Sequence, residues 1–144
     1  MLKSILFVCT GNTCRSPMAE GLFKKMLSDR GITGISVGSA GTMAFGFFPA
    51  SHYAIEVMNE EGIDISAHRS KKITSDLIGK YNMIFTMTSL QRDEVLSGCP
   101  SSANKVFVLK DGGIQDPIGE SIDAYSNICK ILKETLGGVI EKWL

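Results

Sequence analysis

The sequence predicts an α/β fold with a parallel sheet, and three observations lead to that prediction. Short apolar runs rich in β-branched residues alternate with stretches of helical periodicity along the chain. No repeat, linker or block of like charges interrupts this alternation. The 144 residues are 44% hydrophobic and 21% charged, as in an ordinary globular protein. Strands that alternate with helices form parallel sheets with right-handed crossovers, and we expect residues 1–144 to form a single domain.

The first strand, residues 5–8, is a continuous apolar run of the kind found in strands that are buried on both faces. The first helix follows Ser16 and Pro17, since proline is favoured in a first turn, and it ends at Gly31. Its apolar residues recur at helical spacing: Met18, Leu22, Phe23 and Met26. Residues 35–38 are expected to form the second strand.

The remaining expected elements are, in order, a helix from Ser51 to Gly62, a helix after Ser75, a strand at 83–86, a helix at 90–96, a strand at 106–109 and a helix from about Ser121. Serine can cap the two earlier helices, and glycine can end the first of them. Both strands are rich in β-branched and aromatic residues. The last helix carries one apolar face, formed by Tyr125, Ile128, Leu132, Leu136, Ile140 and Trp143.

Charge and cysteine content exclude several classes of protein. Fifteen Lys and Arg residues balance fifteen Asp and Glu residues, which removes the electrostatic case for a nucleic-acid or membrane partner. No apolar run approaches the roughly 20 residues of a membrane span. The four cysteines are too sparse for a disulfide framework, and no secretory leader precedes them. We therefore expect a cytoplasmic protein with reduced thiols, monomeric or weakly self-associating.

The loop between the first strand and the first helix has the composition of an oxyanion site. It reads Cys9-Thr10-Gly11-Asn12-Thr13-Cys14-Arg15-Ser16, and we call residues 9–16 the phosphate loop. Backbone N–H groups in so short a loop can point inward and bind a tetrahedral anion in front of a helix N-terminus. Gly11 and Asn12 tolerate the left-handed conformations that this requires. We expect substrate contacts from Thr10, Gly11, Asn12, Thr13 and Cys14.

Cys9 and Arg15 give this loop its predicted chemistry. Arg15 can offer two parallel N–H groups to phosphate oxygens. The same donors favour a thiolate at Cys9, and a thiolate beside phosphate is a nucleophile for phosphorus. The alternative is an ordinary buried cysteine before a capped helix. The motifs of nucleotide-hydrolysing and dinucleotide-binding loops are absent from the sequence.

The stretch 8–20 resembles the signature of the low-molecular-weight protein tyrosine phosphatases, and its loop is closest to that of the bacterial protein-arginine phosphatases. The similarity extends through Ser39-Ala40-Gly41-Thr42 and His68 to Asp116-Pro117. It implies a three-layer fold in which helices flank a four-stranded parallel sheet. It also implies a phosphorylated protein as substrate, binding of phosphate or other oxyanions, and a cysteinyl-phosphate intermediate. No metal or other cofactor is implied.

Asp116 is the expected general acid, because the leaving group needs a proton and the attacking water then needs a base. It precedes Pro117, which favours an extended loop, and it matches the Asp-Pro pair of the family. The resemblance assigns support of the phosphate loop to Asn12, Ser16, Ser39 and His68. From the sequence alone, Ser16 is a helix N-cap and His68 a surface or core histidine.

Two further features have alternative interpretations. The resemblance suggests that Cys14 forms a reversible, protective disulfide with Cys9 on oxidation, whereas the alternative is a small buried side chain. It also places the region of Phe45 and Phe48 over the pocket, against the substrate side chain. The alternative for these aromatics, with Phe47, is ordinary core.

Substrate preference depends on Thr13. Tyrosine-directed relatives usually have a larger aliphatic residue there, whereas the protein-arginine phosphatases have threonine. A hydroxyl can accept from the N–H of a phosphorylated guanidinium, so phosphoarginine is favoured over phosphotyrosine. A thioredoxin-coupled arsenate reductase would need two further cysteines close together, but Cys99 and Cys129 are far apart in sequence. A non-catalytic phosphate-binding redox module would be expected to lack Cys9, Arg15 or Asp116.

Overall fold

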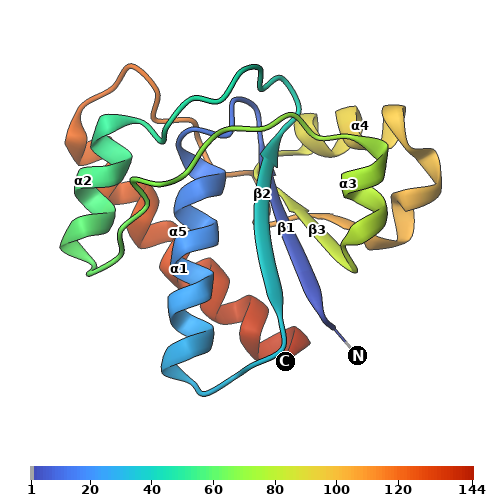
Figure 1. Cartoon of the computed structure of the whole chain (residues 1–144), viewed down its shortest axis with the longest axis horizontal. Coiled ribbons are helices and arrows are strands. Elements are labelled where there is room, and N and C mark those ends of the chain that lie inside the picture. Colours follow the sequence, from blue (N-terminus) through green and yellow to red (C-terminus); the bar gives the residue numbers. More distant parts are fainter. Residues whose placement is uncertain (1) are drawn as a thin grey trace.

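The computed structural model describes residues 2–144, and in them a four-stranded sheet lies between two layers of helices (Figure 1). The strands are β1 (Ser4–Cys9), β2 (Ser36–Gly41), β3 (Met83–Thr86) and β4 (Val106–Val108). They are all parallel, in the order β2-β1-β3-β4. The expected four-stranded parallel sheet is therefore confirmed.

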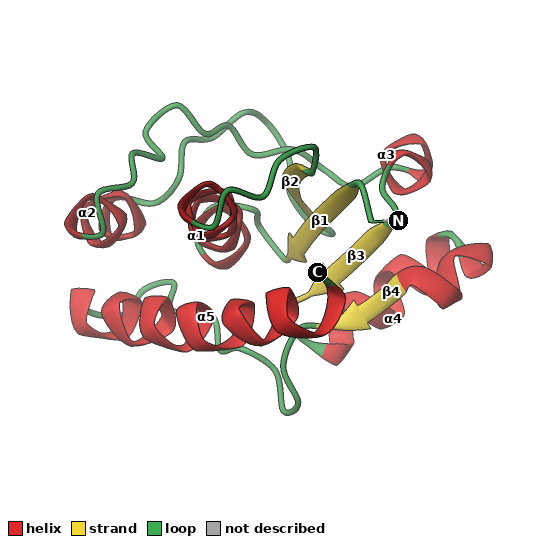
Figure 2. Cartoon of the chain, turned by 90° about the horizontal axis from the view of Figure 1, so that it is seen from below, coloured by secondary structure: helices red, strands yellow, loops and turns green. Residues whose placement is uncertain are grey.

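The helices divide between the two faces of the sheet. One layer contains α1 (Arg15–Asp29), α2 (His52–Glu60) and α5 (Ile122–Trp143). The other contains α3 (Ser75–Lys80), α4 (Ser89–Gly98) and the 3₁₀ helix η1 (Pro100–Lys105). Figure 2 shows the sheet edge-on between α1, α2 and α5 on one side and α3 and α4 on the other. Within residues 2–144, no helix is both long enough and apolar enough to cross a membrane.

The central strand β1 supplies side chains to both cores. Ile5 and Phe7 pack toward α1 and α5, whereas Leu6 and Val8 pack toward α3 and α4. Successive side chains of a strand point to opposite faces, which is why an unbroken apolar run suits this position. Phe7 also packs edge-on against Phe23 of α1, with ring centroids 5.6 Å apart. These contacts fix the carboxyl end of β1, from which the phosphate loop leaves.

The carboxyl ends of the strands meet at one edge of the sheet, at the top of Figure 1. The chain passes from β1 to β2 on one side and then crosses to β3 on the other side of β1. Ligands of open parallel sheets bind where the strand order switches in this way. Cys9 is the last residue of β1 and lies at this switch point.

The structure corrects two expected helix caps. The first helix begins at Arg15 with Cys14 as its N-cap, so Ser16 lies in the first turn rather than at the cap. The hydroxyl of Ser16 contacts Asn12 and Cys9 instead of capping the helix. Helix α3 is capped by Thr74, whose Oγ1 accepts a hydrogen bond of 3.1 Å from the N–H of Leu77, and not by Ser75.

Candidate active site

The phosphate loop encloses the sulfur of Cys9, a residue that is 2% exposed. The N–H of Asn12 donates to Cys9 Sγ over 3.3 Å, and Ser16 Oγ lies 2.9 Å from the same sulfur. Asn12 has a φ of +57°, in the left-handed region that its residue type was expected to tolerate. Helix α1 begins directly behind the loop, at Arg15. The sulfur therefore lies in front of a helix N-terminus, where backbone N–H groups can bind an anion.

The direction of the hydrogen bonds around Cys9 is set by one backbone group. The N–H of Lys71 donates to Asn12 Oδ1 over 3.0 Å, so the amide nitrogen of Asn12 must face the other way. That nitrogen donates to Ser16 Oγ at 2.8 Å and to Ser39 Oγ at 3.0 Å. Since the oxygen of Ser16 accepts from Asn12, its own hydrogen is free to donate to Cys9 Sγ.

Two further groups hold Asn12 in place. His68 Nε2 lies 2.7 Å from the carbonyl oxygen of Asn12, and because a carbonyl only accepts, this nitrogen carries the hydrogen. Ser39 Oγ donates to Glu20 Oε1 over 2.7 Å. The structure thus brings Asn12, Ser16, Ser39 and His68 into one network, and their role in the reaction stays a prediction. Sequence reasoning missed Glu20, whose partner lies 19 residues away with no shared motif.

The opposite wall of the loop rests on helix α4 through Gln91, which sequence reasoning also missed. Gln91 is 2% exposed, and its Nε2 donates to Thr10 Oγ1 over 2.9 Å. Its Oε1 accepts from both the N–H and the hydroxyl of Thr88, each at 2.7 Å. These bonds orient the amide and join the phosphate loop to the start of α4. Thr88-x-x-Gln91 is a capping-box pattern, and that signal could have located the pair.

Strand β2 and the segment after it follow the phosphate loop closely. A Cβ atom on Gly41 would lie only 2.5 Å from the carbonyl oxygen of Thr10, so this position needs glycine. The N–H of Met43 donates to that same oxygen, and the N–H of Ser51 donates to the carbonyl of Thr13. Both bonds measure 2.9 Å. The loop is therefore fixed along its length before any substrate binds.

Arg15 and Asp116 meet at the mouth of the site. The guanidinium of Arg15 is buried; its Nη1 donates to the carbonyl of Ile114 over 2.9 Å, and its Nη2 lies 3.5 Å from Asp116 Oδ2. Arg15 Nε is buried and has no hydrogen-bond partner among residues 2–144. A buried N–H without a partner can donate a hydrogen bond to an anion that enters the site. The side chain of Asp116 is 41% exposed, which leaves it open to water and substrate.

Cys14 points toward helix α5. Its thiol donates to Ser51 Oγ over 3.3 Å and lies 3.5 Å from the hydroxyl of Tyr125. Burial, and next the contact with Cys14, raise the pKa of Tyr125 to about 12. A disulfide between Cys14 and Cys9 would remove the S–H group that donates to Ser51 Oγ. The pairing stays a prediction.

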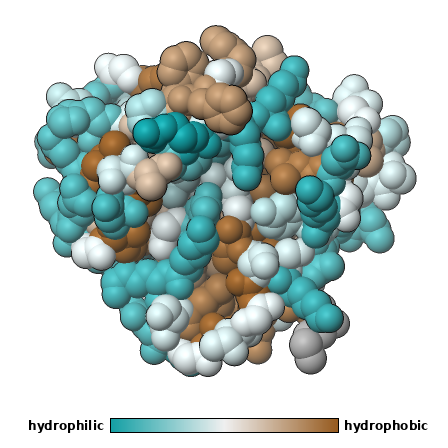
Figure 3. All heavy atoms as spheres, viewed as in Figure 1, coloured by the Kyte–Doolittle hydropathy of each residue, from teal (hydrophilic) through white to brown (hydrophobic). Residues whose placement is uncertain are grey.

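The aromatic residues beyond β2 are not part of the core, which rules out one of their two interpretations. Phe45 is 78% exposed, Phe47 81% and Phe48 53%. Figure 3 shows the resulting brown patch at the top of the molecule. Phe45 and Phe48 pack edge-on against each other, with centroids 6.3 Å apart. Their segment is hydrogen-bonded to the phosphate loop at Met43 and Ser51, and their contact with the substrate side chain stays a prediction.

The two remaining cysteines lie in different layers of the fold. Cys129 of α5 is buried in the core of α1, α2 and α5, whereas Cys99 packs against the core of α3 and α4. Burial, and next the negative charge of Glu61, raise the pKa of the Cys129 thiol to about 11. Cys129 is therefore a poor thiolate, and the sheet lies between the two sulfurs. This arrangement gives no support to a disulfide relay of the arsenate reductase kind.

Comparison with known proteins agrees with this geometry. The family described as low molecular weight phosphotyrosine protein phosphatase matches residues 4–143. A probable low molecular weight protein-tyrosine-phosphatase, EpsP of Ralstonia nicotianae, is 38% identical over 136 residues, covering 92% of this chain and 90% of that protein. A protein-arginine-phosphatase of Geobacillus stearothermophilus is also 38% identical, over 144 residues and 96% and 94% of the two chains. The crystal structure of a YwlE mutant from Bacillus subtilis superposes with a TM-score of 0.92 at 35% identity, over 96% and 97% of the chains.

Proposed function

The chain belongs to the low molecular weight phosphotyrosine protein phosphatase family and is an enzyme of that class, and on this premise we propose that Cys9, Arg15 and Asp116 carry its reaction. The substrate is a phosphorylated side chain of a protein. The observation that carries this proposal is the buried sulfur of Cys9, with the N–H of Asn12 at 3.3 Å and Ser16 Oγ at 2.9 Å, in front of helix α1.

In the first step the thiolate of Cys9 attacks phosphorus, a sulfur–phosphorus bond forms, and the bond from phosphorus to the leaving oxygen or nitrogen breaks. Asp116 gives its proton to the leaving group. Arg15 and the inward N–H groups bind the equatorial oxygens, on which negative charge is spread in the transition state. The hydroxyl of Ser16 stabilises the thiolate before the attack and again when it leaves.

In the second step water attacks the phosphorus of the cysteinyl phosphate. The carboxylate of Asp116 takes a proton from that water, the sulfur–phosphorus bond breaks, and inorganic phosphate leaves. Asp116 is exposed enough to meet bulk water, whereas Cys9 is not. One carboxylate can therefore act as acid and then as base.

Turnover of para-nitrophenyl phosphate in the presence of EDTA tests this scheme. Wild type is expected to be active, Cys9→Ser inactive, and Cys9→Ser still able to bind phosphate. Asp116→Asn is expected to slow substrates with poor leaving groups far more than activated ones, because only the former need the proton. Full activity in Cys9→Ser would exclude the mechanism.

The preferred substrate within this class is phosphoarginine, with phosphotyrosine as the alternative. Overall identity does not separate them, since relatives named for each activity are both 38% identical to the chain. Thr13 is the residue that supports phosphoarginine. Its backbone is fixed by the N–H of Ser51, and its hydroxyl lies 3.8 Å from Cys14 Sγ within the loop. A hydroxyl in that position can accept from the bridging N–H of phosphoarginine, whereas an aliphatic side chain cannot.

The ratio of kcat/KM for phosphoarginine and phosphotyrosine peptides, measured for wild type and Thr13→Ile, tests this preference. Wild type is expected to favour phosphoarginine, and Thr13→Ile is expected to shift the ratio toward phosphotyrosine. A wild-type preference for phosphotyrosine, or an unchanged ratio in the variant, would refute it.

A further inference from the structure

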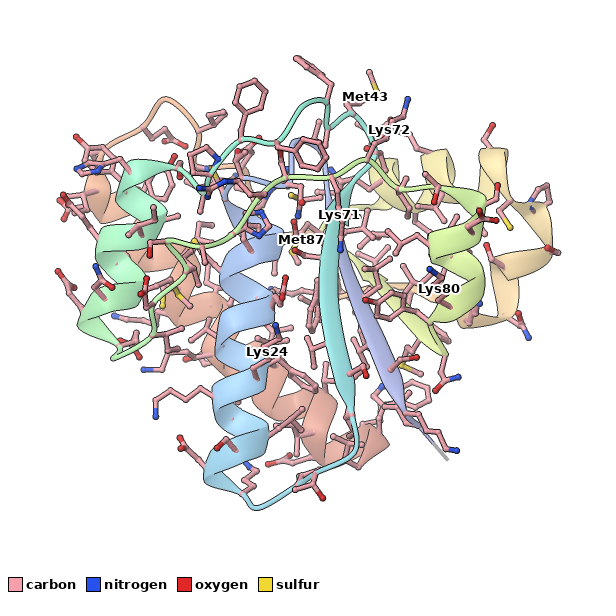
Figure 4. The ribbon with its side chains drawn as sticks, in the orientation of Figure 1. Lys24, Met43, Lys71, Lys72, Lys80 and Met87 are labelled. Atoms are coloured by element: carbon pink, nitrogen blue, oxygen red, sulfur yellow. The ribbon has the colours of Figure 1, made fainter. Side chains whose placement is uncertain are left out.

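The surface beside the phosphate loop combines exposed apolar side chains with exposed cations. Its apolar members are Met43, Phe45, Phe47 and Phe48, and its cations are Arg69 and Lys72, all of them exposed. We call this set the aromatic-basic rim. Figure 4 shows Met43 and Lys72 projecting from adjoining segments at the same end of the molecule. Exposed apolar side chains gathered next to a site are typical of a binding surface.

The backbone under the rim is held at both of its segments. The N–H of Gly41 donates to the carbonyl of Lys71 over 2.9 Å, and the N–H of Ile73 donates back to the carbonyl of Gly41. Ser70 pairs with Phe48 in both directions, at 2.7 and 3.0 Å. The exposed side chains are thus displayed on a fixed backbone, which lowers the entropy lost when a partner binds.

The rim carries a local excess of positive charge. Within residues 2–144, neither Arg69 nor Lys72 forms a salt bridge. The chain as a whole has a formal net charge of zero, so the positive charge of this cluster is a local feature of the surface. Such a patch attracts carboxylates and steers their approach.

We propose that the aromatic-basic rim binds the part of the phosphoprotein that flanks the phosphorylated residue, with an apolar side chain against the phenylalanines and acidic side chains against the cations. This inference rests on the proposed function of the phosphate loop. Both segments of the rim are hydrogen-bonded to the loop: the N–H of Met43 donates to the carbonyl of Thr10, and the N–H of Lys71, between Arg69 and Lys72, donates to the side-chain oxygen of Asn12. A chain whose phosphorylated residue enters the loop can therefore contact the rim. This geometry favours a protein segment over an anionic membrane as the occupant.

Two phosphopeptides with the same phosphorylated residue and the same neighbouring leucine test the proposal, one with glutamates and one with lysines at the flanking positions. Wild type is expected to show a kcat/KM about tenfold higher for the acidic peptide, since exposed ion pairs contribute modestly but act together. Arg69→Gln/Lys72→Gln is expected to reduce that ratio to within about twofold, and high salt is expected to do the same in wild type. Lys80→Gln, on α3 and away from the rim in Figure 4, is the matched control and should retain the wild-type ratio.

A second variant tests the apolar half of the surface. Phe47→Ser is expected to lower kcat/KM for the leucine-containing peptide about fivefold, the scale of partly burying one aromatic ring. All of these variants should hydrolyse para-nitrophenyl phosphate at the wild-type rate, because that substrate is too small to reach the rim. If wild type does not hydrolyse para-nitrophenyl phosphate, the proposed function is refuted. If the double variant keeps the wild-type ratio of kcat/KM between the two peptides, only the binding role of the rim is refuted. The proposal would also be overturned if wild type showed no preference between the peptides but bound phosphatidylserine vesicles, and the double variant did not bind them.

Discussion

At the scale of single residues, the direction of the hydrogen bonds around Asn12 is the property that most controls the nucleophile. The N–H of Lys71 fixes the amide so that Ser16 can donate to the sulfur of Cys9. Asn12→Asp keeps the shape but replaces a donor with an acceptor, so the hydroxyl of Ser16 turns toward the new carboxylate. We expect kcat to fall about 10²-fold, the usual effect of removing one donor to a reacting anion.

Ser39→Ala is the control for Asn12→Asp, because it removes the link to Glu20 and leaves Ser16 and Cys9 in contact. We expect a much smaller loss of kcat in this variant, with both variants assayed on para-nitrophenyl phosphate under identical steady-state conditions. Equal losses in both variants would show that the network acts only by general rigidity.

Cys14 gives a second prediction at this scale. Peroxide converts the Cys9 thiolate to a sulfenic acid, and attack by the Cys14 thiol then forms the disulfide and releases water. Wild type should regain activity with added thiol, whereas Cys14→Ser should recover poorly because Cys9 is oxidised further. Mass spectrometry of the oxidised protein decides the pairing. A disulfide from Cys9 to Cys99 or Cys129, or none, would contradict the prediction.

At the scale of secondary-structure elements, strand β2 limits the shape of the phosphate loop through Gly41. A Cβ atom there would approach backbone atoms of both Thr10 and Asn12, at 2.5 and 3.0 Å. Gly41→Ala should therefore lower the free energy of unfolding by roughly 2 kcal/mol and reduce activity as well. Chemical denaturation and initial rates measure the two effects.

Gly138→Ala is the matched control on helix α5, where an added Cβ atom would meet nothing within 4 Å. Because alanine is the better helix former, this variant should be more stable than wild type by about 0.5–1 kcal/mol, with unchanged activity. Opposite effects of the same substitution at the two positions would distinguish the steric clash at Gly41 from the gain in helix propensity at Gly138. Destabilisation by Gly138→Ala would contradict this reasoning.

Helix α5 also links the stability of the fold to pH. Burial raises the pKa of Cys129 to about 11 and that of Tyr125 to about 12, so both groups stay neutral longer in the folded state than in the unfolded state. Their contribution to stability is complete below about pH 9 and is lost as the pH rises toward 12. Denaturation curves of wild type, Cys129→Ala and Tyr125→Phe should converge as the pH rises. If the difference in unfolding free energy between wild type and each variant did not change with pH, the predicted link between pH and stability would be wrong.

At the scale of the whole molecule, the sequence predicts what depends on local pattern and composition. The apolar run 5–8 predicted strand β1, and Gly31 predicted the end of helix α1. The composition of the phosphate loop predicted the left-handed conformation of Asn12. Sequence reasoning missed Glu20 and Gln91, whose partners are distant in the chain and become neighbours only when α1 and α4 pack against the sheet. The exposed phenylalanines were ambiguous for the same reason, since hydrophobicity does not reveal which side of a loop faces water.

We also propose that residues 1–144 work as one domain, because the phosphate loop takes support from both helical layers at once. Glu20 reaches it from α1, and Gln91 reaches it from α4. Activity and tertiary structure should therefore be lost together in one cooperative transition.

The central claim is that phosphate is transferred to the sulfur of Cys9, and trapping that intermediate tests it most directly. Asp116→Asn removes the base for the second step, so an activated substrate should load the enzyme faster than water can clear it. The protein is mixed with para-nitrophenyl phosphate, quenched within milliseconds and mapped by mass spectrometry under conditions that preserve phosphorus–sulfur bonds. We expect one phosphoryl group per chain, on Cys9 alone, and none in Asp116→Asn/Cys9→Ala. A phosphoryl group on another residue, or turnover with no covalent intermediate, would contradict the account.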